Sequence, residues 1–398
     1  MERQRIAKLA DFYESRLLDD SIPFWLSHAP DGECGGYFTC LDRQGAVYNT
    51  DKSVWFQGRG AWMFSKLYNE VEKRREWLDA AKTGIEFMLA HCFDADGRMF
   101  FTVTRDGRPL QKRRYMFSET FAVIALAEYS KAAGDAAALL RAKSVFAMVE
   151  DIYRNGKTTP KIDPNTRRTK SHSLPMILLS VIQVLREAGG AAEYDAFAAE
   201  LVNELLGNFV KPEIRALLET VGEHGERLDS PQGRCVNPGH AIETSWFLMH
   251  EALYRHDKAL LKSALDILRW SIELGWDKEF GGIFAFVDVE GRPPEQLEWD
   301  MKLWWPHTEA LYAFLLAHRI TGEAIYETWY ETIHEYAFGR FADAQYGDWY
   351  GYLHRDGTVS NTLKGSMWKG MFHLPRALLL CRTLLNEMKD EKETLPVL

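Results

Sequence analysis

The chain has 398 residues, of which 46% are hydrophobic, with a formal net charge of −9 and a pI near 5.8. No run of Lys and Arg is long enough to follow a phosphate backbone, and no apolar stretch is long enough to span a bilayer, so we expect neither nucleic acid nor membrane as a partner. The five cysteines contain no CxxC pair, which argues against a disulfide framework and against a zinc site. Because the amino terminus also lacks the apolar core of a secretory signal, we expect a cytoplasmic protein.

Four short segments share one pattern: an acidic residue, a glycine, an aromatic pair and a turn that ends in glycine. They begin at Asp31, Asp94, Asp277 and Asp343. Alternating aromatic and β-branched residues between glycine-containing turns predict short β-hairpins. Between the hairpins, apolar residues recur three and four positions apart, which predicts helices over 118–134, 241–256 and 307–322.

The spacing of these hairpins predicts a sixfold repeat. The first two begin about 60 residues apart, as do the last two, and the wider middle gap is close to three such periods. Units of this length have room for two helices and their connections. We therefore predict an all-α fold, an (α/α)6 barrel with short β-hairpins in the inter-helix loops, as a single domain over residues 1–398. An open solenoid would leave an apolar end exposed.

Polar residues recur where each unit begins its next helix. In chain order they are Arg59, Glu119, His172, His240 with Glu243, His307 with Glu309, and His373. The four histidines follow one another at nearly equal intervals, close to the period of the repeat. Because equivalent positions in a ring of equal units point at the same mouth, we expect these groups to converge on one cavity. Tryptophans, whose faces suit a sugar ring, lie near the same positions. They are Trp55, Trp62, Trp246, Trp299, Trp304, Trp305 and Trp368.

Histidines around a cavity favour proton transfer next to a carbonyl, with removal of a proton on one face and its return on the other. The guanidinium of Arg59 would stabilise the enolate oxygen. Motifs of other chemistries, HExxH, GxSxG and the phosphate-binding loop, do not occur. Inverting glycosidases with this kind of barrel need two carboxylates, whereas histidine dominates the repeated position here.

Longer motifs carry a family resemblance. They are GGYFTCLDRQG, WFQGRGAW, NPGHAIETSWF, QLEWDMKLWWPHTEAL, YGDWYGYLHRDG and LKGSMWKGMFHLPRA. From about residue 20 to residue 385 the chain resembles the N-acylglucosamine 2-epimerase family, known in animals as renin-binding protein. The resemblance implies an (α/α)6 barrel, commonly a homodimer, that interconverts N-acetylglucosamine and N-acetylmannosamine. The implied chemistry is deprotonation and reprotonation at C2 of the open-chain sugar.

The resemblance also implies roles for single residues. His240 of NPGH and His373 of MFHLPRA would be the acid/base pair, and Arg59 would stabilise a cis-enolate. Glu243 would support His240. His307 and Glu309 would help to open the sugar ring and orient the substrate. Further substrate contacts are expected from Trp55, Glu119, His172, Arg234, Trp304 and Trp368.

No pair of histidines stands at i and i+4 on one helix with a third ligand nearby, so the residues predict no metal site. The family resemblance implies an enzyme that requires no cofactor. Several members use ATP as an allosteric activator that is not consumed, bound near a loop with a PGTR-like sequence. This chain has PNTR at 164–167, an altered form of that loop.

Three alternatives stay open on the residues alone. An epimerase or aldose–ketose isomerase of unsubstituted sugars such as mannose or glucose would use the same enolate. The sequence SLPM at 173–176, where the acyl-sugar enzymes tend to have AVPM, leaves room for a different aldose. A binding protein would use the barrel as an interaction surface and would tolerate loss of His240 or His373. An (α/α)6 glycosidase is a more distant third.

Overall fold

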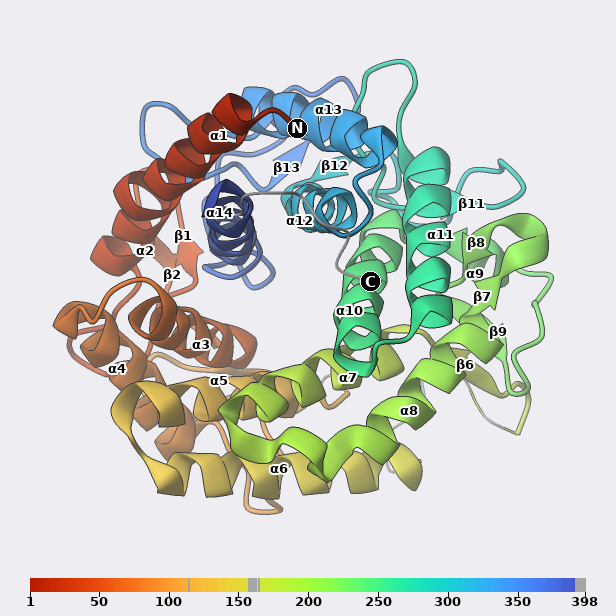
Figure 1. The fold of residues 1–398 in the computed structure, drawn as a ribbon. Coiled ribbons are helices and arrows are strands. Elements are labelled where there is room, and N and C mark those ends of the chain that lie inside the picture. The colour runs from red at the N-terminus through yellow and green to blue at the C-terminus, as the bar shows by residue number, and fades with distance from the viewer. Residues whose placement is uncertain (114, 157–162, 164, 391–398) are drawn as a thin grey trace.

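Long helices form two concentric layers in the computed structural model, which describes residues 1–113, 115–156, 163 and 165–390 (Figure 1). The inner layer consists of α3 (Val54–Glu70), α5 (Phe117–Ala133), α7 (Ser173–Leu185), α10 (Pro238–Arg255), α12 (Trp304–Thr321) and α14 (His373–Asp390). The outer layer consists of α4 (Arg75–His91), α6 (Ala136–Arg154), α8 (Asp195–Glu204), α11 (Lys258–Gly275), α13 (Ala324–Arg340) and α1 (Arg3–Ser15). The predicted (α/α)6 barrel is confirmed.

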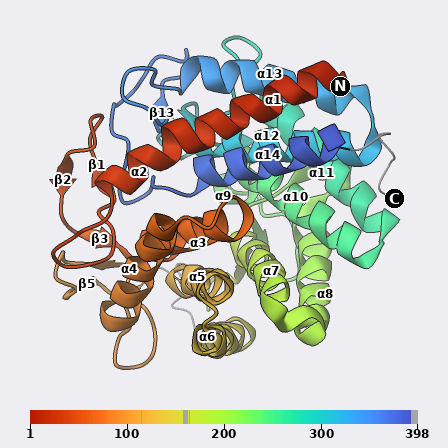
Figure 2. The ribbon, with the colours of Figure 1, turned by 60° about the vertical axis from the view of Figure 1, so that its left-hand side comes forward.

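The two ends of the chain close the ring. The chain begins in the outer layer with α1, which continues through η1 (Arg16–Ser21) into α2 (Ile22–His28), and it ends in the inner layer with α14. Helix α1 packs against α14, and Figure 2 shows it running alongside α13 and α14. The sixth helix pair is therefore built from residues at opposite ends of the sequence. Within the described part of the chain, no helix is both long and apolar enough to cross a membrane.

Burial explains the composition of the inner helices. Helix α5, with the sequence FSETFAVIALAEYSKAA, is buried on nearly all sides, as expected for a helix surrounded by neighbours. It ends at Gly134, whose φ of +66° is the left-handed conformation typical of a helix C-cap. Asp135 then begins α6 by accepting hydrogen bonds from the backbone N–H groups of Ala137 and Ala138. A tight turn between inner and outer helix follows from these two residues.

Two of the four predicted hairpins form as expected. Strand β1 (Cys40–Leu41) pairs with β2 (Val47–Asn49), and β4 (Thr102–Val103) pairs with β5 (Pro109–Gln111). In the segments that begin at Asp277 and Asp343, the local pairing is reduced to isolated bridges. Their strands pair with other units instead: β11 (Val287–Asp288) with β10 (Cys235–Val236), and β13 (Tyr352–Leu353) with β12 (Lys302–Leu303).

Other short elements complete the loops at both ends of the barrel. Strand β3 (Lys52–Ser53) pairs with β4, β6 (Thr169–Ser171) with β9 (Thr220–Gly222), and β7 (Val210–Lys211) with β8 (Ala216–Leu217). The remaining helical turns are η2 (Arg186–Gly190), η3 (Ala191–Tyr194), η4 (Leu205–Phe209), η5 (Pro212–Ile214) and α9 (Pro231–Arg234).

The recurring acidic residue of the hairpin pattern is structural. Asp31, Asp277 and Asp343 are buried carboxylates, and each pairs with one lysine and one arginine. The clusters are Asp31 with Lys52 and Arg105, Asp277 with Lys302 and Arg355, and Asp343 with Lys364 and Arg43. In each cluster the arginine comes from the loop of a neighbouring unit. Since Arg43 lies in the first hairpin and Asp343 in the last repeat, the third cluster helps to close the ring.

Candidate active site

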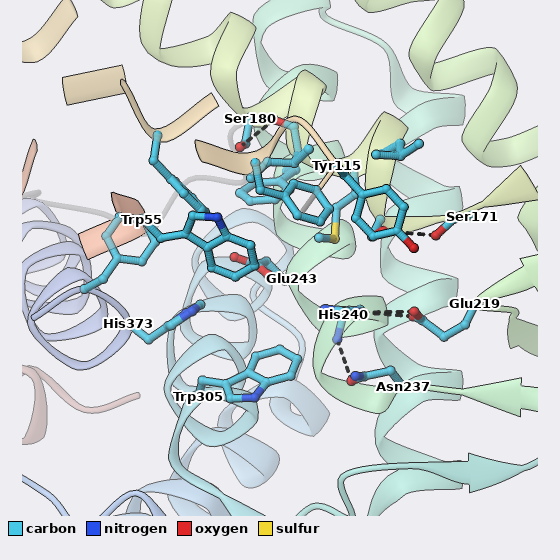
Figure 3. A pocket seen from close by; sticks show the side chains of 18 of the residues that line it. Trp55, Tyr115, Ser171, Ser180, Glu219, Asn237, His240, Glu243, Trp305 and His373 are labelled. Atoms are coloured by element: carbon cyan, nitrogen blue, oxygen red, sulfur yellow. Dashed lines mark hydrogen bonds and ion pairs between the residues drawn. The ribbon is translucent and has the colours of Figure 1, made fainter. Parts of the chain in front are cut away.

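A cavity of about 1370 Å³ lies inside the ring of inner helices. Its mouth is formed by the amino-terminal ends of these helices and by the loops that lead into them, and Figure 3 shows side chains that line it. Trp55, Trp304 and Trp368 line this mouth, as predicted. Arg167, Arg168 and Lys170 add positive charge to the rim. Pro164 of the PNTR sequence lies outside the described residues.

His240 faces the cavity from the first turn of α10. Asn237 caps this helix by accepting the His240 backbone N–H, and Pro238 occupies its first position. The ring Nδ1 of His240 donates to the carboxylate of Glu219, with both oxygens 3.1 Å away. This bond holds the proton on Nδ1 and leaves Nε2 as the nitrogen that can act on a substrate. Burial acts to lower the pKa of His240, but the negative charge of Glu219 outweighs it, so the pKa is raised.

His373 faces the same cavity from the first position of α14. Its surroundings shift its pKa in the direction opposite to that of His240. Its Nδ1 donates to Glu309 Oε1 at 2.8 Å. Arg376, one turn later, donates from Nη2 to Glu309 at 2.7 Å and to Glu243 at 2.6 Å. Burial, followed by the positive charges of Arg59 and Arg376, holds the pKa of His373 well below its usual value.

The two histidines flank one space. The indole of Trp305 lies beside both, with ring centroids 5.1 Å from His240 and 5.7 Å from His373 (Figure 3). At neutral pH the environments favour a neutral His373 and a protonated His240. Two titratable groups whose pKa values are pushed apart are typical of an acid and a base that act together. The arrangement can remove a proton from one side of a bound molecule and supply one from the other.

Arg59 provides a positive charge beside these histidines. Its guanidinium carbon lies 4.0 Å from the ring centre of Phe121 and 4.8 Å from that of Phe372. Within the described residues its Nε is buried without a hydrogen-bond partner. Burial and the nearby Arg376 lower the pKa of Arg59 to about 9. Because a buried cation that lacks a carboxylate partner is costly, this site favours an anion or a developing oxyanion.

The structure contradicts the expected placement of His307 at the mouth. His307 is fully buried on the side of α12 that faces α13, where its ring stacks on Tyr336. Its Nδ1 donates to the carbonyl of Leu303 at 2.6 Å, and its Nε2 accepts the N–H of Ile283 at 2.9 Å. Burial lowers its pKa to about 3. Successive helical residues turn by about 100°, so His307 points away from Trp305 while Glu309 returns to nearly the same side. His307 is therefore a structural residue that anchors the start of α12.

Three expected substrate contacts also do not line the cavity. Glu119 is buried and accepts hydrogen bonds from Arg98 and from the backbone N–H of Met99. Arg234 pairs with Asp288 and Asp229 outside the cavity. His172 lies behind Glu219, with Nδ1 3.5 Å from that carboxylate and Nε2 2.8 Å from the Thr244 hydroxyl.

Two residues of the site were not predicted. Arg376 could have been found, because it lies three positions after His373 on the same helix and therefore on the same face. Glu219 had no such signal, since it lies between β8 and β9 and outside the repeated position at the helix starts. Glu309, which was predicted, lies one layer behind the cavity wall, where Trp246 Nε1 also donates to it.

Among the residues that the structure describes, two groups of side chains have ligand atoms close enough for a metal ion. They are His172, Glu219 and His240, and Glu243, Glu309 and His373, each with the atoms within 4.8 Å of one another. In the second group, the guanidinium of Arg376 already occupies the space between the two carboxylates, which disfavours a cation there. In the first group, the Glu219 carboxylate is engaged by His240.

Comparison with known proteins identifies relatives along nearly the whole chain. Residues 36–377 match the family model described as N-acylglucosamine 2-epimerase (GlcNAc 2-epimerase). The N-acylglucosamine 2-epimerase of Bos taurus is 42% identical over 388 residues, which cover 94% of this chain and 90% of the relative. That of Homo sapiens is 37% identical over 383 residues, 93% and 89% of the two chains. The structure of cellobiose 2-epimerase from Spirochaeta thermophila has a TM-score of 0.84 at 22% identity and covers 97% of this chain and 98% of its own, which shows the same fold.

Proposed function

Because this chain belongs to the N-acylglucosamine 2-epimerase family, we propose that it is an isomerase that interconverts N-acetyl-D-glucosamine and N-acetyl-D-mannosamine. The observation that carries the proposal is the pair His240 and His373, which flank one cavity with pKa values shifted in opposite directions. An epimerisation at C2 needs these two groups: one that takes a proton from one face, and one that gives a proton to the other.

In the proposed reaction, the neutral His373 removes the proton from C2 of the open-chain sugar. The C–H electron pair forms a C1–C2 double bond, and the aldehyde oxygen becomes the oxyanion of a cis-enolate. Arg59 stabilises this oxyanion, because its guanidinium lines the cavity and, among the described residues, its Nε has no hydrogen-bond partner. The protonated His240 then gives its proton to the opposite face of C2, and the aldehyde is restored with inverted configuration. In the reverse direction the two histidines exchange roles.

The carboxylates behind the histidines position them. Glu219 holds the proton on Nδ1 of His240, and Glu309 does the same for His373. Arg376 joins Glu309 to Glu243 and keeps this group close to electrically balanced. We therefore assign Glu309 to orientation of His373 and leave the opening of the sugar ring without an assigned residue among the described ones.

The alternative substrates are unsubstituted sugars such as mannose or glucose, and they are not favoured, because relatives that share 37–42% identity are N-acylglucosamine 2-epimerases. We propose that the enzyme needs no cofactor, since histidines and an arginine supply the proton transfers and the charge. We further propose a homodimer in the cytoplasm. The family resemblance supports the dimer, and five cysteines without a disulfide in the described residues support a reducing compartment.

The test is incubation in D2O with N-acetylmannosamine, N-acetylglucosamine, mannose or glucose, with and without ATP, while NMR follows deuterium at C2. We expect deuterium in the epimeric product of the N-acetyl sugars before it appears in the remaining substrate, because different histidines serve the two faces. His240→Asn and His373→Asn should each abolish turnover, whereas a protein that uses the barrel only as an interaction surface for a partner would be indifferent to both substitutions. Absence of C2 exchange in every sugar, with and without ATP, would refute the proposal.

A further inference from the structure

The cavity continues well beyond the layer of the two histidines. On α10 its lining runs from His240 to His250, and on α14 from His373 to Leu380. With a rise of 1.5 Å per helical residue, these spans extend about 15 Å and about 10 Å past the histidines. We call this inner part the deep chamber. Its wall includes Ile124, Ile177, Ser180, Val184, Phe247 and Leu380, and the polar side chains of Lys66, Gln183, Glu187 and His250 line it as well.

The polar groups of the deep chamber are already bonded to other protein groups. The Ser180 hydroxyl donates to the carbonyl of Ile177 at 3.0 Å, and His250 Nε2 lies 2.8 Å from the Tyr312 hydroxyl. Gln183, which also reaches the cavity, donates from its amide to the carbonyl of Phe247 at 2.9 Å. At the far end, the charge of Lys66 is paired with Glu187 at 2.9 Å. Because these four polar groups have partners within the protein, a polyhydroxylated chain would find few free hydrogen-bonding groups beside them.

The mouth of the cavity is polar instead. Ser171, Asn237 and Gln232 line it together with the charged Arg168 and Glu298. The hydroxyl-bearing carbons of an open-chain sugar therefore have hydrogen-bond partners on the mouth side of the histidines. In the proposed reaction, C2 lies between His240 and His373 and C1 faces Arg59. The remaining substituent of C2, the acylated nitrogen, then has the apolar side of the cavity available.

We propose that the deep chamber binds the N-acyl group of the substrate and accepts acyl chains longer than acetyl, a specificity that rests on the proposed epimerase function. Chamber length matches this role, because the spans along α10 and α14 exceed the length of a four- or six-carbon acyl chain. On α7, which follows His172, Ile177 lies about one and a half helical turns further along the helix than His172. Val184 lies two turns beyond Ile177 on the same face of the helix. These two residues therefore mark the near and the far part of the chamber.

The experiment compares the epimerisation of N-acetyl-, N-butanoyl- and N-hexanoylglucosamine. In the unmodified enzyme we expect KM to fall by about fourfold for each methylene buried, with kcat little changed, because the added groups contact the protein equally before and during the reaction. Ile177→Phe narrows the near part and should lower kcat/KM for the butanoyl and hexanoyl sugars by about tenfold relative to the acetyl sugar. Val184→Phe should do so for the hexanoyl sugar alone.

Leu140→Phe is the control, because it enlarges an exposed side chain on the outer helix α6 and should leave both ratios to the acetyl sugar unchanged. The kcat/KM for each longer acyl sugar is divided by the kcat/KM of the same variant for the acetyl sugar. Because both values scale with the amount of folded enzyme, any loss of folded protein in a variant cancels in this ratio. If the unmodified enzyme epimerises the acetyl sugar but its kcat/KM falls more than about 100-fold for the butanoyl sugar, the deep chamber is not the acyl site and the proposed function stands. If no N-acylglucosamine is epimerised, both proposals fail.

Discussion

Glu219→Gln is the substitution that most directly tests how the site keeps its proposed general acid, His240, protonated. The carboxylate of Glu219 accepts from His240 Nδ1 with both oxygens, and its charge is what raises the pKa of that histidine against burial. Glutamine keeps the size of the side chain but removes the charge. If its amide nitrogen turned to Nδ1, it would also favour the tautomer that carries the proton on Nε2.

The expected loss follows from the type of contact. Removing one partner of a buried ion pair costs roughly 3–5 kcal/mol, and 1.4 kcal/mol is a factor of ten. Because 28% of the His240 side chain remains exposed, we take the lower part of this range. We expect kcat to fall about 100- to 1,000-fold, within the range for a positioned general acid. Since burial still lowers the pKa of His240 in the variant, the protonated form is lost at lower pH, and the alkaline limb of kcat/KM should shift downward.

The assay is C2 deuterium exchange and epimer formation by NMR between pH 5 and 10. Glu200→Gln is the matched control, because Glu200 lies on the outer helix α8 and pairs with Arg154 far from the cavity. A Glu219→Gln enzyme with kcat within threefold of the unmodified enzyme and an unshifted alkaline limb would show that Glu219 does not set the protonation state of His240.

Three further predictions follow from the surrounding contacts. Arg376→Gln removes a positive charge beside His373, so the pKa of His373 should rise and the acidic limb of kcat/KM, where the base becomes protonated, should move to higher pH. Lys302→Met removes one of the two cations that pair with the buried Asp277 and should lower the free energy of unfolding, measured by urea titration, by about 3 kcal/mol. In the control, Lys278→Met changes an exposed side chain and should alter this free energy by less than about 0.5 kcal/mol. His307→Ala leaves the buried backbone N–H of Ile283 unpaired and should lower the free energy of unfolding by about 3 kcal/mol. The kcat of the folded variant should nevertheless stay within about threefold of the unmodified enzyme. A 100-fold loss of kcat would instead show that this histidine takes part in catalysis.

Much of the fold could be predicted because it follows from spacing. Hairpin segments that recur about every 60 residues require a repeated two-helix unit, and the apolar periods between them require helices. Strand pairing was less predictable. The segments at Asp277 and Asp343 resemble the first two hairpins locally, but their strands pair with neighbouring units, and such long-range pairing is not specified by alternation of residues within one segment.

The repeat also predicted which helix starts meet at the cavity, but it could not tell a position that faces the cavity from one that faces the protein interior. His240, His307 and His373 are almost equally spaced, and only the first and the last face the cavity.

The sequence by itself determined the barrel, the convergence of the helix starts, and the placement of His240, His373 and Arg59 at the cavity. Tertiary structure decided the rotation of each inner helix about its axis, which turns Glu309 towards His373 and His307 towards the backbone of Ile283. It also decided that Glu219, from a loop outside the repeat, reaches His240. The physical reason is that a shift of one residue turns a helical side chain by about 100°, and packing between the two layers, rather than local sequence, selects among these orientations.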